Sequence, residues 1–283
     1  RSLRWLGERL NVCPNTVRRL LRERTYSLQA NRKRLSGKAH PDREAQFGHI
    51  EAQIQAFLER GWPIISVDAK KRELIGPFRN AGRLWCQTPP DVNTYDFPSL
   101  AEGVAIPYGI YDPTHNRGYV FVGTSRNTAE LAVDAVAWWW SIYGQRLFPN
   151  APALLTLADG GGSNGYRNRL WKYSLQHKIA NVTRLAVTVS HYPTGASKWN
   201  PIEHRLFGPI STNWAGEPLI SHAKTLNLIR GTTTQQGLVV HARLSRKKYR
   251  TGIKVPDDQM EALYLHPDDF LPAWNYTIKP HPD

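Results

Sequence analysis

The chain has 283 residues, 41% of them hydrophobic and ten of them tryptophan, and it carries a formal net charge of +14. This length accommodates one large domain, or a large and a small one, with a substantial buried core. No apolar run approaches the ~20 residues that a membrane-spanning helix needs. The composition therefore argues against a membrane protein and favours a polyanionic partner.

The positive charge is concentrated in residues 1–43, which hold twelve Lys and Arg against Glu8, Glu23 and Asp42. This segment carries +9, which leaves +5 for the other 240 residues. A basic block beside a nearly balanced body predicts an arm that binds nucleic acid. A solvated basic helix is the alternative.

Cysteine is scarce, since only Cys13 and Cys86 are present and they form no C-x-x-C pair. This pattern predicts neither a disulfide framework nor a structural zinc site, and it favours a reducing cytoplasm. The first residue is Arg1 rather than methionine. We therefore expect a fragment whose N-terminal segment is truncated.

The basic block has the pattern of two helices. Leucines recur at helical spacing in residues 3–12, a break follows at 13–15, and residues 16–24 form a basic helix that Asn15 or Thr16 could cap. This is the layout of a helix-turn-helix, although an ordinary helical hairpin fits too. The second helix offers three guanidinium groups to DNA phosphates or guanine edges, namely Arg18, Arg19 and Arg22.

The rest of the chain predicts an α/β domain with a mixed sheet flanked by helices. We expect three parts, namely a helix-turn-helix segment with a basic linker over 1–40, a connecting helix over 41–60, and a main domain over 61–283. Strands are predicted at 63–68, 103–112, 118–124, 152–159 and 184–190, and helices at 128–147, 164–178 and 200–214. Beyond these we expect a helix near 219–230, a basic strand pair near 237–255 and a Pro-rich tail.

Three acidic residues stand at informative positions in this pattern. Asp68 and Asp159 each end an apolar strand, and that edge of an open α/β sheet is where ligands bind. Either one alone is more simply a turn or cap residue. Glu203 follows 44 positions after Asp159, one turn into the helix that Asn200 and Pro201 begin. We therefore expect the three carboxylates to meet in one crevice.

Carboxylate oxygens are the ligands that Mg²⁺ prefers in proteins. Two such ions, roughly 3.5–4 Å apart, clamp the attacking and leaving oxygens of an in-line phosphoryl displacement. The triad therefore predicts phosphoryl-transfer chemistry at two divalent metal ions. Asp68, a strand aspartate, is the natural carboxylate for the two ions to share.

Three sequence blocks resemble one known family. They are SVDAKKRELIGPF around Asp68, LADGGGSNGYRNRLWK around Asp159 and HYPTGASKWNPIEHRLFGPIS around Glu203. Together with TVRRLLRERTYSLQANRKRLSGKAHPDREAQF upstream, they are similar to the Rhodopirellula-type DDE transposases of bacterial insertion sequences. The resemblance covers nearly the whole chain.

The resemblance implies an RNase H-like catalytic domain over 61–283 with a C-terminal extension. It also implies Mg²⁺ or Mn²⁺ dependence, with Asp68, Asp159 and Glu203 as catalytic metal ligands. The implied reaction is DNA cleavage and strand transfer at transposon ends. The implied partners are the terminal inverted repeats and target DNA, bound by a homodimer or larger assembly in the bacterial cytoplasm, on the nucleoid.

Further basic and polar residues are candidates for DNA contacts. Lys70, Lys71 and Arg72 follow Asp68 and could reach phosphates, or could simply be a solvated strand end. Trp199 could stack on an unpaired base or cap the next helix. Residues expected in loops that rim the crevice are Ser163, Asn164, His191, Lys198, Trp199 and Asn200. A second basic patch, expected to follow a DNA backbone, comprises Arg243, Arg246, Lys247, Lys248 and Arg250.

Other functions stay open from the sequence alone. A nuclease or integrase would use the same triad without transposing, and the N-terminal reader argues for site-specific recognition. A catalytically decayed transposase could persist as a DNA-binding repressor, against which the intact triad argues. A glycosidase also uses paired carboxylates, but the basic charge fits it poorly.

Overall fold

The computed structural model describes residues 2–27, 29, 40–196 and 199–282. The chain divides into two compact units, Arg1–Lys38 and Ala39–Asp283. In the described ranges no helix is long and apolar enough to cross a membrane.

The smaller unit is built of helices α1 (Leu3–Leu10) and α2 (Pro14–Glu23). The Ser2 hydroxyl caps α1 by accepting a backbone N–H of its first turn at 3.1 Å. Helix α2 begins with its proline, whose fixed φ suits a first turn. The expectation that Asn15 or Thr16 caps α2 is therefore wrong, because both lie inside the helix.

The larger unit contains a nine-stranded sheet in the order β7-β4-β3-β1-β5-β6-β9-β8, with β2 paired to β3. The strands are β1 (Ile64–Ala69), β2 (Glu73–Ile75), β3 (Gly103–Asp112), β4 (Arg117–Gly123), β5 (Ala153–Asp159), β6 (Ala186–Tyr192), β7 (Val239–Ser245), β8 (Leu265–Pro267) and β9 (Asn275–Ile278). Strands β1, β5 and β6 are parallel, and β3 is antiparallel to both β1 and β4. The central order β4-β3-β1-β5-β6 with this polarity is RNase H-like, which confirms the expected fold.

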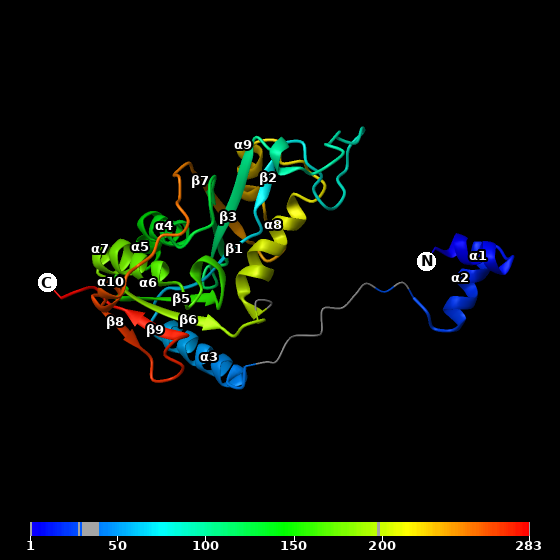
Figure 1. Ribbon diagram of the computed structural model, residues 1–283. Coiled ribbons are helices and arrows are strands. Elements are labelled where there is room, and N and C mark those ends of the chain that lie inside the picture. Colours follow the sequence, from blue (N-terminus) through cyan, green and yellow to red (C-terminus); the bar gives the residue numbers. More distant parts are fainter. Residues whose placement is uncertain (1, 28, 30–39, 197–198, 283) are drawn as a thin grey trace. The chain divides into compact units, whose positions relative to one another are not determined.

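Helices cover both faces of this sheet (Figure 1). They are α3 (Arg43–Glu59), α4 (Ala129–Trp139), α5 (Gln145–Leu147), α6 (Arg169–Leu175), α7 (Asn181–Thr183), α8 (Gly208–Asn213), α9 (His222–Arg230) and α10 (Asp257–Glu261). Helices α4 and α6 pack on one face, whereas α3, α8 and α9 share cores with the other. The sheet thus lies between two layers of helices.

The alternation of side chains along β1 and β5 determines which face of the sheet carries Asp68 and Asp159. On β1, Ile65 and Val67 belong to the core under α4, whereas Ile64 belongs to the core under α3. Because side chains alternate along a strand, Asp68 lies on the α3 side of the sheet. The same alternation on β5 places Asp159 on that side.

The predicted elements agree with most of the structure in the central sheet, and the helix predicted near 219–230 is α9; the strands after residue 230 differ. The run Trp138-Trp139-Trp140 within the predicted helix 128–147 is buried in the core. The predicted strand pair at 237–255 is wrong, because this segment contains the single strand β7. That strand pairs in parallel with β4 rather than with a hairpin partner. The Pro-rich tail contains β8 and β9, which were not expected, and β9 extends the sheet beside β6.

A glycine on β3 lets the Glu203 segment approach the sheet closely. Gly109 is paired with Asp68 in the β1–β3 register. A Cβ atom at this glycine would lie 2.5 Å from the ring of Phe207 and 2.9 Å from the side chain of Ile202. Both of these residues are buried beside Glu203. The missing side chain at position 109 therefore sets how closely the third acidic residue can approach the first.

Replacement of Gly109 by alanine is expected to lower the free energy of unfolding by about 1–3 kcal/mol, because the added methyl group overpacks a tight contact. The same shift should move Glu203 relative to Asp68. Urea unfolding measures the first effect. Gly48→Ala in α3 is the matched control, since a Cβ there meets nothing within 4 Å. Equal stability of the two variants would contradict this account of the packing.

Candidate active site

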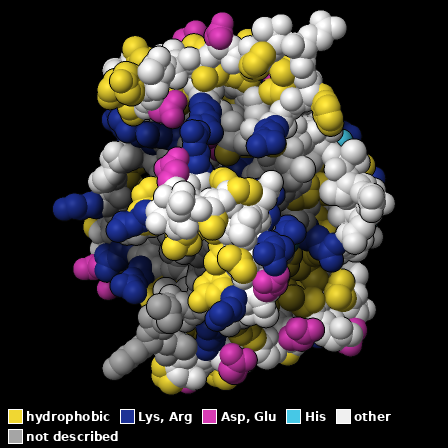
Figure 2. Space-filling view, turned by 90° about the vertical axis from the view of Figure 1, so that its right-hand side faces the viewer, with side chains coloured by type: hydrophobic (Ala, Val, Ile, Leu, Met, Phe, Trp, Pro, Cys, Tyr) yellow, Lys and Arg dark blue, Asp and Glu magenta, His cyan; other side chains and the backbone are white. Residues whose placement is uncertain are grey.

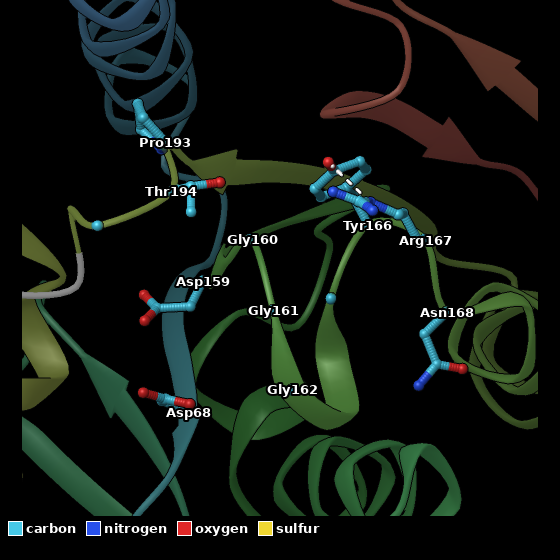
Figure 3. A pocket seen from close by; sticks show the side chains of 12 residues that line it. Asp68, Asp159, Gly160, Gly161, Gly162, Tyr166, Arg167, Asn168, Pro193 and Thr194 are labelled. Carbon is cyan, nitrogen blue, oxygen red and sulfur yellow. Dashed lines mark hydrogen bonds between the residues drawn. The ribbon is translucent and has the colours of Figure 1, made fainter. Parts of the chain in front are cut away.

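Asp68 and Asp159 lie side by side at the ends of two parallel strands. The β1–β5 register pairs Val67 with Ala158, and the two aspartates are the next residue on each strand. Figure 3 shows both carboxylates pointing in the same direction. The structure thus brings together the two strand-end acids that the sequence singled out.

The two aspartates border a cleft of about 690 Å³. Its other lining residues come from three segments, namely the glycine turn 160–162, residues 165–168, and the turn 193–195 that follows β6. Tyr166 and Arg167 lie across the cleft from the carboxylates (Figure 3). The carboxylates therefore stand at the edge of a space open to a substrate.

Glu203 begins a π-helical turn, Glu203–Phe207, which continues into α8. Its carboxyl group, like the charge of Asp159, raises the pKa of Asp68, so it lies close enough to act on that residue. Asp68 is therefore the carboxyl group that interacts with both of the others.

Burial disfavours the charged forms of both aspartates, and nearby charges add to this at Asp68. Burial, followed by the charges of Asp159 and Glu203, raises the pKa of Asp68 well above its usual range. Burial also raises the pKa of Asp159, while the hydrogen bond from Asn200 opposes that rise. A cation between the carboxylates would relieve this repulsion, as metal sites commonly do.

A hydrogen-bonded clamp joins the three segments that carry the acids. The Asn200 amide donates to Asp159 Oδ1 at 2.9 Å, and the Ser66 hydroxyl donates to Asn200 Oδ1. Ser66 in turn accepts the backbone N–H of Ile202 at 3.2 Å. Both Ser66 and Asn200 are fully buried. The clamp therefore fixes β1 and β5 to the start of the Glu203 turn.

The sequence analysis missed Ser66 and placed Asn200 only at the rim. The sequence nevertheless contains a signal for the role of each of these two residues. Ser66 stands two residues before Asp68, so it shares its strand face, and Asn200 lies three residues before Glu203. A polar residue at a buried strand position needs a hydrogen-bond partner. For Ser66 this partner is Asn200, the asparagine of the WNPIE block.

His191 is not in a rim loop, as the sequence analysis expected, but is fully buried on β6. Its Nδ1–H donates to the backbone carbonyl of Asp159 at 3.0 Å, and its Nε2 accepts from Tyr276 at 3.2 Å. Trp171 donates to the same Tyr276 hydroxyl at 3.1 Å. Burial lowers the pKa of His191 to about 4. The neutral imidazole thus holds the backbone at the end of β5.

The other expected rim residues lie at varied depths. Ser163 and Asn164 are buried in the 3-10 turn Gly162–Asn164, so they do not rim the cleft either. Lys198 is outside the described residues. Trp199 is 46% exposed, and the guanidinium of Arg43 lies 4.8 Å from its ring centroid. One face of this indole is therefore already covered by α3.

The donor set suits a hard divalent cation, because it consists of carboxylate oxygens alone. Within the described ranges, no three His, Cys, Asp or Glu side chains are placed to hold an ion as they stand. Asp68 nevertheless interacts with each of the other two acids. The three acids thus act on one another electrostatically around Asp68.

The basic residues after Asp68 differ in exposure. Lys70 is partly buried, with Nζ 5.0 Å from the ring centroid of Trp214. Lys71 and Arg72 are exposed and border a second cleft of about 260 Å³, together with Arg79. A basic surface therefore continues from the carboxylates along β2.

The arginines of the smaller unit also differ in their contacts. Arg18 and Arg22 border a groove that is lined mainly by apolar side chains, among them Leu3 and Leu6. Arg19 forms an ion pair with Glu23 at 2.7 Å. Arg18 and Arg22 are exposed along α2, which is where a DNA-reading helix would present them.

The second basic patch follows β7. Lys247 is held by Asp134 at 2.8 Å, and this ion pair anchors the segment to α4. Arg246 and Lys248 flank it and are exposed, as are Arg243 and Arg250. All five predicted basic residues are therefore exposed, and Lys247 in addition forms an ion pair within the protein.

The chain resembles solved structures only distantly, and no curated protein matches it in sequence. A Mos1 transposase paired-end complex with the left transposon end shows 15% identity and a TM-score of 0.45, and a pre-cleavage Mos1 transpososome shows 13% and 0.46. A mariner Mos1 paired-end complex with Mg shows 14% and 0.47. Each alignment covers 79% of this chain and 64% of the Mos1 chain.

Similarity to a sequence family is far more extensive. The family described as Rhodopirellula transposase DDE domain matches residues 3–280, which is nearly the entire chain. The match includes both aspartates at the cleft, the Ser66–Asn200 clamp and Glu203. The chain belongs to the Rhodopirellula transposase DDE domain family.

Proposed function

We propose that this protein is an insertion-sequence transposase that cuts DNA at transposon ends and transfers the cut strand to target DNA. The observation that carries the proposal is the placement of Asp68 and Asp159 on one face of neighbouring parallel strands, with the Glu203 turn fixed beside them by Ser66. Membership of the family supports the same reaction.

In this proposal Asp68, Asp159 and Glu203 would hold Mg²⁺ or Mn²⁺, as two ions. Bound ions of this kind activate a water or a 3′-hydroxyl and stabilise the leaving oxygen in an in-line displacement. Asn200 orients the Asp159 carboxylate through its 2.9 Å hydrogen bond. His191 fixes the main chain of the same residue, so the carboxylate has little freedom to rotate away.

The proposed partners are the terminal inverted repeats of the element and target DNA. Figure 2 shows Lys and Arg side chains at the surface of the chain. Arg18, Arg19 and Arg22 are proposed to read or hold the repeat, and Lys70, Lys71, Lys198 and Trp199 to line the path at the carboxylates. The patch of Arg246, Lys247 and Lys248 is proposed to follow the backbone. Pairing two DNA ends calls for a homodimer or a larger assembly, acting on the nucleoid in the cytoplasm.

Replacement of Asp159 by asparagine tests the proposal. The variant is expected to lose Mg²⁺-dependent nicking and strand transfer on DNA that carries the element's terminal repeats, because a metal ligand is removed. Gel analysis of end-labelled DNA measures both products. Glu261→Gln, which neutralises an exposed acid of α10, should retain full activity. Unchanged activity of the Asp159 variant would rule out the metal site.

A further inference from the structure

The cleft beside Asp159 has a floor that is almost free of side chains. Five of its lining residues are glycines, namely Gly160, Gly161, Gly162, Gly165 and Gly195. Glycine lets a ligand approach the main chain closely. A volume of about 690 Å³ lies within the range of pockets that enclose a small organic molecule the size of a nucleotide.

Arg167 stands on the wall opposite the carboxylates, and Tyr166 holds it there. Its Nε–H donates to the Tyr166 hydroxyl at 2.9 Å, and its guanidinium lies 5.1 Å from the centroid of the same ring (Figure 3). Arg167 is exposed, and among the described residues it forms no ion pair with an acid. The terminal nitrogens of the guanidinium are therefore available to bind a phosphate in bidentate fashion.

We infer that this glycine-floored cleft is a subsite for one nucleotide of the DNA strand, next to the phosphodiester that reacts at the carboxylates. The phosphate of that nucleotide binds Arg167, and its backbone passes over the turn at Gly161. This inference rests on the proposed function, because it names where the substrate strand lies at that same site. It adds residues that bind the strand without touching a metal ion.

Gly161 allows the cleft to be blocked without disturbing the fold. Its φ of −128° is open to any residue, and an added Cβ meets nothing within 4 Å. A side chain at this position would therefore extend into the open cleft. By contrast, Gly165 would place a Cβ 2.9 Å from the main chain of Gly161, so its replacement would disturb the turn itself.

The test compares Gly161→Leu with Gly48→Leu, an exposed glycine of α3 with equally open surroundings. The probe is an eight-nucleotide single-stranded DNA, with Ca²⁺ in place of Mg²⁺ so that binding is measured without cleavage. Gly161→Leu is expected to bind it about tenfold more weakly, and Gly48→Leu as tightly as the unchanged protein. A free mononucleotide should bind weakly to all forms, since it offers only one phosphate.

Arg167→Gln gives an independent readout. Loss of one phosphate contact should lower the slope of log affinity against log salt by about 0.7, the value for one phosphate of a single strand. Tyr166→Phe removes the hydroxyl that holds Arg167 and should weaken binding with the salt slope unchanged. An unaltered slope in Arg167→Gln, or equal affinities of the two leucine variants, would overturn the inference.

Metal binding separates failure of the subsite from failure of the proposed function. Mn²⁺ titration should give the same affinity for Gly161→Leu as for the unchanged protein, because no carboxylate is altered. If Gly161→Leu binds DNA normally while Asp159→Asn is inactive, the subsite is wrong and the metal site stands. If Asp159→Asn is fully active, the proposed function fails, whatever the leucine variants show.

Discussion

Replacement of Asp68 by asparagine is expected to abolish DNA cleavage and, at the same time, to stabilise the metal-free protein. Loss of this proposed metal ligand should slow cleavage about a thousandfold or more, which corresponds to roughly 4 kcal/mol in the barrier. Asp68 is also the most crowded of the three acids, since burial and two neighbouring carboxylates disfavour its charge. An uncharged amide of the same size removes that repulsion.

The gain in the free energy of unfolding should be about 1–2 kcal/mol, or a few degrees in melting temperature. Mg²⁺ should raise the melting temperature of the unchanged protein, because an ion that binds only the folded state stabilises it. It should leave that of Asp68→Asn nearly unaltered. Thermal unfolding with and without Mg²⁺ measures both effects. If Asp68→Asn is less stable than the unchanged protein when both are measured without metal, the acids do not repel one another.

The clamp around Asn200 gives the second large effect. Asn200→Ala removes the donor to Asp159 and leaves the buried Ser66 hydroxyl without its acceptor. We expect a loss of about 1–3 kcal/mol in the free energy of unfolding. Cleavage should slow about a hundredfold, since a displacement of about 1 Å at a reacting centre has that effect. Asn200→Asp should be worse, because it adds a further buried carboxylate beside Asp159.

A double-mutant cycle with Ser66→Ala and Asn200→Ala tests the clamp directly. Because both residues belong to one hydrogen-bonded unit, the double variant should lose less stability than the two single losses combined. The coupling should be about 0.5–3 kcal/mol, measured by urea unfolding. Strictly additive losses would mean that the two side chains act separately.

The central sheet was predictable because its strands have strong local patterns. Strands β1 and β5 are buried on both faces, so their apolar runs are nearly continuous. Strands β2, β8 and β9 have only three or four residues each, and so short a strand has no distinctive periodicity. The basic segment at 237–255 resembled a hairpin because the pattern of a strand does not reveal its partner. Strand β7 pairs with β4, more than a hundred residues earlier.

The acids of the site could be located from strand ends and from the family blocks, but their supports could not. Pairing of β1 with β5 and the depth of His191 depend on contacts between residues far apart in sequence. The π-helical turn at Glu203 is equally invisible in the pattern, since a run of helical residues does not show where an extra residue is accommodated. The exposure and the orientation of these side chains could therefore be determined only from the tertiary structure.

The order of strands in the sheet also determines when this site can first exist during synthesis. Asp68 lies on a strand whose parallel neighbour, β5, is made about ninety residues later, and the clamp residue Asn200 is made later still. Strand β9 then closes the sheet against β6, and its Asn275 bonds with Gln46 of α3. A nascent chain that ends between Glu203 and β9 therefore carries all three carboxylates on a sheet that β9 has not yet closed. The proposed DNA-cutting activity should therefore appear only in chains that have been translated through the last strand of the sheet.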